Sequence, residues 1–286
     1  MPGPLPVGAP WPKSNQLDRA PGIRSFHAYV HVPFCDVRCG YCDFNTYTAK
    51  ELGGVNQSSF HEDLVREIEF SSAVLGEMPP LSSIFIGGGT PSLFTAEQIQ
   101  AILGSLEATF GLEVGCEVTL EANPESSNPD YFRQLRGVGV NRLSMGVQSF
   151  DPQVLKTLDR QHDPERVAPL IESAKEQGLT TSVDLIYGTP GETLESWQRT
   201  LAKALDLKTD HISAYSLIVE PGTKLARQIA SGELASPDDD LNAEMYELLS
   251  NLVQDSELEW YEVSNWGKPS VHSSSYWQSQ NWWGYG

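Results

Sequence analysis

Short runs of β-branched and aromatic residues alternate along this chain with longer stretches in which apolar residues recur at helical spacing. The short runs predict six strands, at 26–32, 83–87, 117–121, 142–146, 181–187 and 211–216. The clearest helical stretches are 59–75, 95–110, 164–177 and 194–207, each with Ser, Thr or Asp near its start. Because strands and helices alternate, the pattern predicts repeated βα units and a parallel sheet.

Six consecutive βα units favour an α/β fold of the partial (βα)6 TIM-like barrel type, with the sheet left open. Gly178 directly follows the third of the clear helical stretches and predicts a helix end there. In barrels of this kind the functional residues gather at the carboxyl ends of the strands. The strand ends are therefore where we expect the site residues.

The pattern changes after Pro221. An acidic helical region at 237–255 is followed by a short strand at 260–263 and an aromatic tail. This predicts a smaller C-terminal α+β module at 222–286, and the final Trp, Tyr and Gly run suggests that this module is interrupted. The Pro- and Gly-rich segment 1–24 predicts a disordered leader, which leaves 25–221 for the partial barrel.

The charge and hydropathy of the chain exclude some partners. The formal net charge of −19 over 286 residues disfavours binding to nucleic acid or to an anionic membrane surface, because phosphates would be repelled. Neither a signal-peptide pattern nor an apolar run of membrane-spanning length is found in the sequence. We therefore expect a cytoplasmic protein without stable membrane insertion.

Three of the four cysteines, Cys35, Cys39 and Cys42, fall within a loop predicted after the first strand. Such crowding indicates a metal site, and soft thiolates select iron-sulfur clusters or zinc. Three ligands on a cubane leave one iron open, which can chelate the amino and carboxylate groups of a small molecule. A zinc site completed by His27 or His31 is the alternative. Cys116 stands apart and is expected in the core.

A glycine run, Gly87-Gly88-Gly89-Thr90-Pro91, follows the second predicted strand. Without side chains, its backbone amides and carbonyls can approach a ligand closely, although a run of this kind can also be an ordinary tight turn.

Polar residues follow or end the later strands. Glu121, Gln148 and Asp184 each stand at a predicted strand end, where a carboxylate can bind an ammonium or a ribose hydroxyl. Taken singly, each could instead be a helix cap or a surface residue. Arg160 could pair bidentately with a ligand carboxylate, or could lie on a helix surface.

Together these segments resemble the HemN/HemW branch of the radical SAM superfamily, from Tyr29 to Pro221. The shared motifs are Tyr-Val-His-Val-Pro-Phe-Cys, Gly-Gly-Gly-Thr-Pro, Arg-Leu-Ser-Met-Gly-Val-Gln-Ser-Phe and Asp-Leu-Ile-Tyr-Gly-Thr-Pro-Gly-Glu. The resemblance implies a 4Fe-4S cluster on Cys35, Cys39 and Cys42, with S-adenosylmethionine at the open iron. It further implies S-adenosylmethionine contacts from Tyr29, Tyr41, Gly88, Gly89, Thr90, Glu121, Gln148, Arg160, Asp184 and Ile218.

The branch contains an oxidase and a heme chaperone. The resemblance implies a further Cys two positions after the third cluster ligand in the oxidase, where this chain has Phe44. The segments Cys42-Asp-Phe-Asn-Thr and Trp260-Tyr-Glu-Val-Ser-Asn-Trp266 favour the chaperone. Oxygen-independent coproporphyrinogen III oxidase, or another radical SAM enzyme, is the alternative. Whether the chain is itself an enzyme stays open, and no catalytic residue is assigned.

The segment His272-Ser-Ser-Ser-Tyr276-Trp277 resembles a His-Asn-x-x-Tyr-Trp heme motif of the chaperones, from which Ser273 departs. The resemblance implies heme bound by His272 beside Tyr276 and Trp277, and transfer to heme-accepting proteins, membrane-bound respiratory enzymes among them. Taken alone, a His in a Ser-rich loop would be a surface residue.

Overall fold

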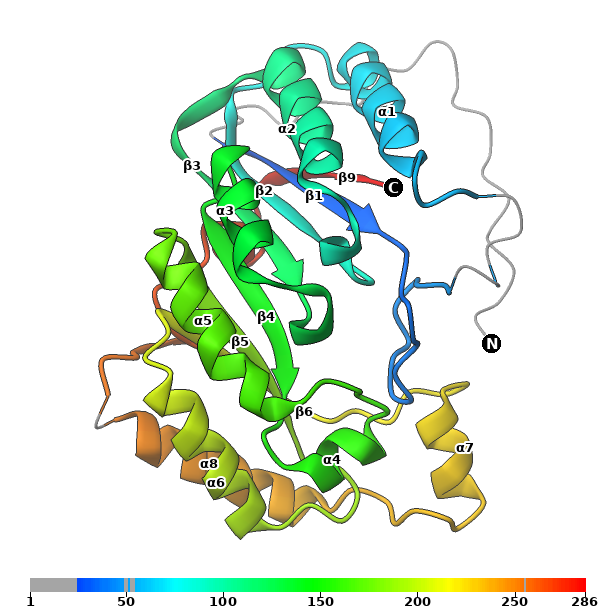
Figure 1. Ribbon diagram of the computed structural model, residues 1–286, viewed down its shortest axis with the longest axis vertical. Coiled ribbons are helices and arrows are strands. Elements are labelled where there is room, and N and C mark those ends of the chain that lie inside the picture. Colours follow the sequence, from blue (N-terminus) through cyan, green and yellow to red (C-terminus); the bar gives the residue numbers. More distant parts are fainter. Residues whose placement is uncertain (1–24, 49–50, 52–54, 255) are drawn as a thin grey trace.

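The computed structural model describes residues 25–48, 51, 55–254 and 256–286, and the predicted leader 1–24 lies outside them (Figure 1). Among the described residues, no helix combines the length and the apolar character that crossing a bilayer requires.

Six parallel strands form the centre of the structure, and each pairs with the next one along the chain. They are β1 (Phe26–Val32), β2 (Leu81–Gly88), β3 (Leu112–Ala122), β4 (Arg142–Gln148), β5 (Thr180–Tyr187) and β6 (His211–Ser216). All six predicted strands are present, with β2, β3, β4 and β5 longer than predicted. The partial-barrel prediction is confirmed, because this sequential parallel order is that of consecutive βα units and the sheet does not close.

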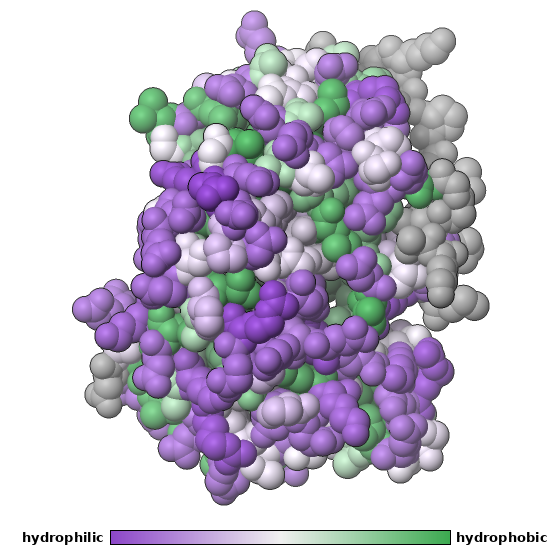
Figure 2. Space-filling view, viewed as in Figure 1, coloured by the Kyte–Doolittle hydropathy of each residue, from purple (hydrophilic) through white to green (hydrophobic). Residues whose placement is uncertain are grey.

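The connecting helices cover one face of the sheet, and Figure 1 shows α2, α3 and α5 packed along it. The helices are α1 (Phe60–Leu75), α2 (Ala96–Phe110), α3 (Pro129–Gly137), α4 (Pro152–Thr157), α5 (Val167–Glu176) and α6 (Leu194–Asp206), with 3-10 turns η1 (Pro91–Leu93), η2 (Pro124–Ser126) and η3 (Pro164–Arg166). The predicted helix at 164–177 is therefore η3 followed by α5. Figure 2 shows this face as mostly hydrophilic, with apolar residues scattered among polar ones.

Strand β4 shows how the sheet separates core from cavity. Leu143, Met145 and Val147 are fully buried in the hydrophobic core on the helix side. The intervening residues, Arg142 and Ser144 among them, face the inside of the barrel and line a cavity. Because successive side chains of a strand point to opposite faces, one strand serves both surfaces.

The C-terminal segment extends the same sheet at both edges. It contains α7 (Lys224–Ala230), α8 (Asp239–Val253), β7 (Trp260–Glu262), β8 (Asn265–Gly267), α9 (Val271–Trp277) and β9 (Asn281–Tyr285). Strand β8 is antiparallel to β6, and β9 is parallel to β1, which gives the order β7-β8-β6-β5-β4-β3-β2-β1-β9. Residues 222–286 thus contribute strands to the barrel sheet, and their folding as a separate module stays a prediction.

Candidate functional site

A cavity of about 670 Å³ lies inside the partial barrel. This volume suits a small organic ligand or cofactor. At one end it reaches the loop after β1 and the carboxyl ends of the strands, which we call the cysteine end (Cys35, Cys39, Cys42, Glu121 and Arg160). At the other it reaches helix α9, which we call the α9 end (Arg142, His211, Tyr261, His272 and Tyr276).

The cavity brings together nearly all the residues that the sequence singled out. Those that line it are Tyr29, Cys35, Cys39, Tyr41, Cys42, Gly88, Gly89, Thr90, Glu121, Gln148, Arg160, Asp184, Ile218, His272 and Tyr276. Trp277 is not among the lining residues and is 66% exposed. Its expected place beside heme stays a prediction.

The cysteine loop is closed at its base by backbone hydrogen bonds. The Cys35 amide donates to the Tyr47 carbonyl at 2.9 Å, and the Tyr47 amide donates to the Pro33 carbonyl at 2.7 Å. The loop therefore leaves β1 and returns to it, which holds the intervening cysteines at the mouth of the cavity.

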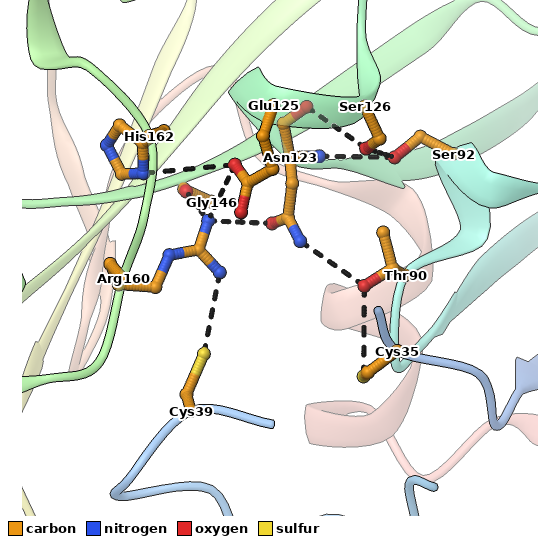
Figure 3. A network of polar contacts seen from close by, with 10 residues as sticks. All are labelled: Cys35, Cys39, Thr90, Ser92, Asn123, Glu125, Ser126, Gly146, Arg160 and His162. Atoms are coloured by element: carbon orange, nitrogen blue, oxygen red, sulfur yellow. Dashed lines mark hydrogen bonds and ion pairs between the residues drawn. The ribbon is translucent and has the colours of Figure 1, made fainter. Parts of the chain in front are cut away.

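Each of the three thiols has a polar neighbour. Cys35 Sγ lies 3.8 Å from Thr90 Oγ1, and Cys39 Sγ lies 3.7 Å from Arg160 Nη1 (Figure 3). Cys42 Sγ lies 3.8 Å from Thr46 Oγ1. Donors around cluster sulfurs stabilise the negative charge of bound thiolates.

The donor set fits an iron-sulfur cluster better than the zinc alternative. Within the described part of the chain, no three His, Cys, Asp or Glu side chains converge on one metal ion. The three thiols of a cubane bind three different irons and stand further apart. His27 bonds to Ser83 and Gln280, and His31 to Tyr29 and Asn45, so both imidazoles are engaged in hydrogen bonds with groups other than the thiols.

The glycine run packs directly beneath the cysteine loop. The Gly89 amide donates to the Val32 carbonyl at 2.7 Å. A Cβ on Gly89 would lie 2.5 Å from the Phe34 carbonyl oxygen and 3.0 Å from Cys35 Sγ. Gly88 has φ +113°, where other residues are strained. The run is therefore required by its contact with the loop as well as by the bend after β2.

Two carboxyl groups, those of Glu121 and Asp184, face the cavity. Glu121 accepts the Gly88 amide at 3.1 Å, and burial together with the neighbouring Asp184 raises its pKa to about 8. Burial also raises the pKa of Asp184, which accepts from Ser144 Oγ at 2.9 Å. Both side chains touch the cavity but lie away from bulk solvent. The pair is therefore ready to accept a cationic group, whose charge would return both acids to carboxylates.

Arg160 is buried beside the cysteine loop, with 6% of its side chain exposed. Its Nη2 donates to the Gly146 carbonyl at 2.9 Å and to Asn123 Oδ1 at 3.0 Å (Figure 3). The alternative of a helix-surface residue does not describe this environment. Asn123, which sequence reasoning missed, also donates to Thr90 Oγ1 at 3.3 Å and so connects Arg160 to the glycine run. Asn123 could have been found from the sequence, because it stands two residues after Glu121 at the end of a predicted strand.

Gln148 ends β4 with φ 64°, in the left-handed region that few residues other than glycine adopt. Its side chain lies close to Gly146, since a Cβ there would be 3.0 Å from Gln148 Nε2. Backbone strain of this kind is concentrated at functional sites. At the cavity mouth, Ile218 is 68% exposed and Tyr41 packs against a small cluster beside β5.

His272 lies on α9 and is 2% exposed, so the interpretation as a surface residue in a Ser-rich loop is wrong. Helix α9 forms there because Glu117 accepts the Val271 and His272 amides at 3.1 Å, and the Ser270 hydroxyl at 3.0 Å. A carboxylate at a helix N-terminus satisfies amides that the helix itself leaves free.

The α9 end contains polar residues that the sequence analysis did not single out as site residues, although four of them stand within its quoted motifs. They are Arg142, Ser144, His211, Ser213, Tyr261 and Asn265. Four of them occupy alternate positions of β4 and β6, on the face opposite the core. Because side chains alternate between the two faces of a strand, the sequence could have assigned these four to the inner face. The positions of Tyr261 and Asn265 depend instead on how β7 and β8 pair.

Comparison with known proteins agrees with this architecture. Residues 29–204 match the radical SAM superfamily. The heme chaperone HemW of Mycobacterium tuberculosis (strain CDC 1551 / Oshkosh) is 46% identical over 91% of this chain and 68% of its own length. HemW of Bacillus subtilis (strain 168) is 35% identical over 91% and 69%. The solved structure of coproporphyrinogen III oxidase (HemN) from Escherichia coli superposes with a TM-score of 0.76 at 27% identity, covering 89% of this chain and 58% of that one.

Proposed function

This chain belongs to the radical SAM superfamily, in its HemN/HemW branch, and on that premise we propose that it is a heme chaperone, which binds heme and passes it to acceptor proteins. The HemW relatives support this proposal by their identity across most of the chain. Phe44 supports it as well, because its exposed phenyl ring lines the cavity where the oxidase would have a thiol.

We propose that Cys35, Cys39 and Cys42 hold a 4Fe-4S cluster. Such a cluster, with one iron open, supplies a site for the amino and carboxylate groups of S-adenosylmethionine and, when reduced, an electron. Arg160 would stabilise the Cys39 thiolate, since its guanidinium already lies against that sulfur. Glu121 and Asp184 would bind the cationic and hydroxyl groups of the same ligand.

The observation that carries the heme proposal is a buried chain of hydrogen bonds that ends at His272. Gln280 Nε2 donates to Gln278 at 2.7 Å, so its Oε1 is the atom that faces His27 Nε2 at 2.8 Å. Since that oxygen only accepts, His27 carries its proton on Nε2. His27 Nδ1 must then accept from the Ser83 hydroxyl, 2.8 Å away.

The same logic fixes the protonation of His272. Because the Ser83 proton is directed to His27, Ser83 Oγ accepts from His272 Nδ1 at 2.8 Å. His272 Nε2 is therefore unprotonated and accepts from the Tyr276 hydroxyl at 2.9 Å. Burial lowers the pKa of His272 to about 3, so the ring is neutral at physiological pH. A neutral imidazole with Nδ1–H held and a lone pair on Nε2 is what an axial heme ligand requires.

Tyr276 would have to release His272 Nε2 before an iron could bind. Its side chain is 41% exposed, which leaves it room to turn outwards. We infer a cytoplasmic location, and the acceptors of heme would be proteins there or at a membrane.

The proposal is tested by a heme titration after anaerobic reconstitution of the cluster, followed through the Soret band. Stoichiometric binding that weakens at least tenfold in His272→Ala is expected. His162→Gln is the matched control, because His162 is a buried imidazole that does not line this cavity. Absence of heme binding beside a well-formed cluster would contradict the proposal.

The structural similarity to HemN makes the oxidase a second candidate. Incubation of the loaded protein with coproporphyrinogen III, S-adenosylmethionine and a reductant, without oxygen, tests it. We expect no decarboxylated product, and its formation would favour the oxidase.

A further inference from the structure

Arg142 is a buried cation at the α9 end that the proposed function leaves unexplained. It is 4% exposed and begins β4 on the face that looks into the cavity. Within the described residues its guanidinium makes no side-chain hydrogen bond, and no carboxylate oxygen lies within the 4.0 Å of an ion pair. Buried charges in proteins are otherwise paired or hydrogen-bonded.

The neighbours of Arg142 do not satisfy it. Thr119 is its register partner across β3 and β4, yet the Thr119 hydroxyl has no partner either among the described residues. Glu117, two residues earlier on the same face, accepts three hydrogen bonds from the N-terminus of α9. Asp184 accepts from Ser144. Neither carboxylate therefore forms an ion pair with Arg142, although the charge of Arg142 acts to lower the pKa of Asp184 against the larger effect of burial.

The remaining groups around Arg142 are neutral. His211 Nε2 lies 2.8 Å from the Tyr261 hydroxyl, and His211 Nδ1 lies 2.7 Å from the Ser182 hydroxyl, so both ring nitrogens are occupied. Burial, together with the charge of Arg142, holds the pKa of His211 far below its usual value. Arg142 is thus an unpaired cation in the cavity wall, and His211 beside it carries no charge.

Arg142 and His272 belong to the same end of the cavity. The His272 amide donates to Glu117 at 3.1 Å, and Glu117 lies two residues before Thr119, the register partner of Arg142. A ligand that reaches the His272 ring can therefore place a second group at Arg142. A guanidinium binds a carboxylate through two parallel hydrogen bonds, which makes an acid the expected partner.

We propose that Arg142 binds a carboxylate of the molecule that occupies the α9 end. The inference rests on the proposed function, under which that carboxylate is a heme propionate. A small organic acid would present the same chemistry to the guanidinium.

The test compares mesoporphyrin IX with its dimethyl ester on the cluster-loaded protein, by fluorescence quenching. The metal-free porphyrins bind independently of iron ligation by His272, and they differ only in the two carboxylates. The wild type should bind the acid roughly ten- to hundredfold more tightly than the ester. In Arg142→Gln this difference should disappear, whereas Arg136→Gln, at an exposed position of α3, should keep it.

Equal binding of acid and ester by the wild type would overturn the inference without any mutation, so poor folding of the variant cannot hide the answer. A difference in affinity between acid and ester that persists in Arg142→Gln would also overturn the inference, because another group would then bind the carboxylate. If neither porphyrin binds, the heme proposal fails. The melting temperature of the protein with and without sodium propionate then tests whether Arg142 binds a small acid. A rise in the wild type that is absent in Arg142→Gln supports a small acid at Arg142, and no rise rejects the inference.

Discussion

The two ends of the cavity are built in different ways. The cysteine end draws its thiols from one short loop, while Asn123 follows β3 and Arg160 follows α4. The α9 end draws its groups from across the sheet: His27 lies on β1, Ser83 on β2, Arg142 on β4 and His272 on α9. The thiols of the first end are therefore local in sequence, whereas the groups of the second meet only once the sheet has formed.

The difference also appears in the electrostatics. At the cysteine end, burial raises the pKa of Glu121 and of the Cys35 and Cys42 thiols, so acidic groups are held protonated until a cation or metal arrives. At the α9 end, burial lowers the pKa of His211 and His272 and keeps them neutral. The first end is suited to positive ligands, and the second offers nitrogen lone pairs and one cation.

Cys39→Ala should have the largest effect, confined to the cysteine end. Two remaining thiolates cannot hold a cubane with an exchangeable fourth iron, so we expect complete loss of the cluster absorbance near 400 nm and of acid-labile sulfide. Cys116→Ala, which removes a buried core thiol, is the matched control and should retain both. A cluster that survives in Cys39→Ala would refute the ligand assignment.

Ser83→Ala should weaken heme binding about 10- to 100-fold, because the hydroxyl that fixes the His272 tautomer is lost. Ser182→Ala removes the corresponding hydroxyl beside His211 and serves as the control. Soret titrations of both variants measure the effect. Equal affinities in the two variants would show that the chain through His27 does not position His272.

Acid should destabilise the wild type through its buried neutral histidines. The pKa of His272 is about 3 in the folded state and about 6.5 when unfolded, so below pH 6.5 the unfolded chain binds more protons. Stability is therefore lost as pH falls from 6.5 towards 3, by about 2 kcal/mol at pH 5 from this residue. Urea unfolding measures the free energy of unfolding at pH 7 and at pH 5. The difference between the two values should be smaller in His272→Asn than in the wild type. An unchanged difference would mean that the ring is protonated or exposed.

Tyr276→Phe should have the smallest effect, and in the favourable direction. Removing the hydroxyl frees His272 Nε2 from a competing hydrogen bond, which is worth about 1 kcal/mol, so heme should bind about fivefold more tightly. Weaker binding in this variant would indicate that Tyr276 itself contacts the porphyrin. A Soret titration beside the wild type distinguishes the two.

Most residues of the cysteine end could be singled out from the sequence because they stand in short motifs at or after strand ends, and their roles stay predictions. The six strands were also found, since β-branched runs mark them directly. Helix α9 was missed because Ser273 to Ser275 have little helical preference, and the helix depends on Glu117, more than 150 residues away. The alternation of β4 places Arg142 on the inner face, but its position opposite Thr119 depends on the sheet register.

The most direct test of heme ligation by His272 is chemical rescue of His272→Gly. The variant lacks the imidazole but keeps the cavity, so added imidazole can take the place of the missing ring. We predict that ferric heme bound to the variant regains the wild-type Soret maximum and EPR signal when imidazole is added. Spectra of the wild type and of the variant that are identical before imidazole is added would contradict the account, because another residue would then ligate the iron.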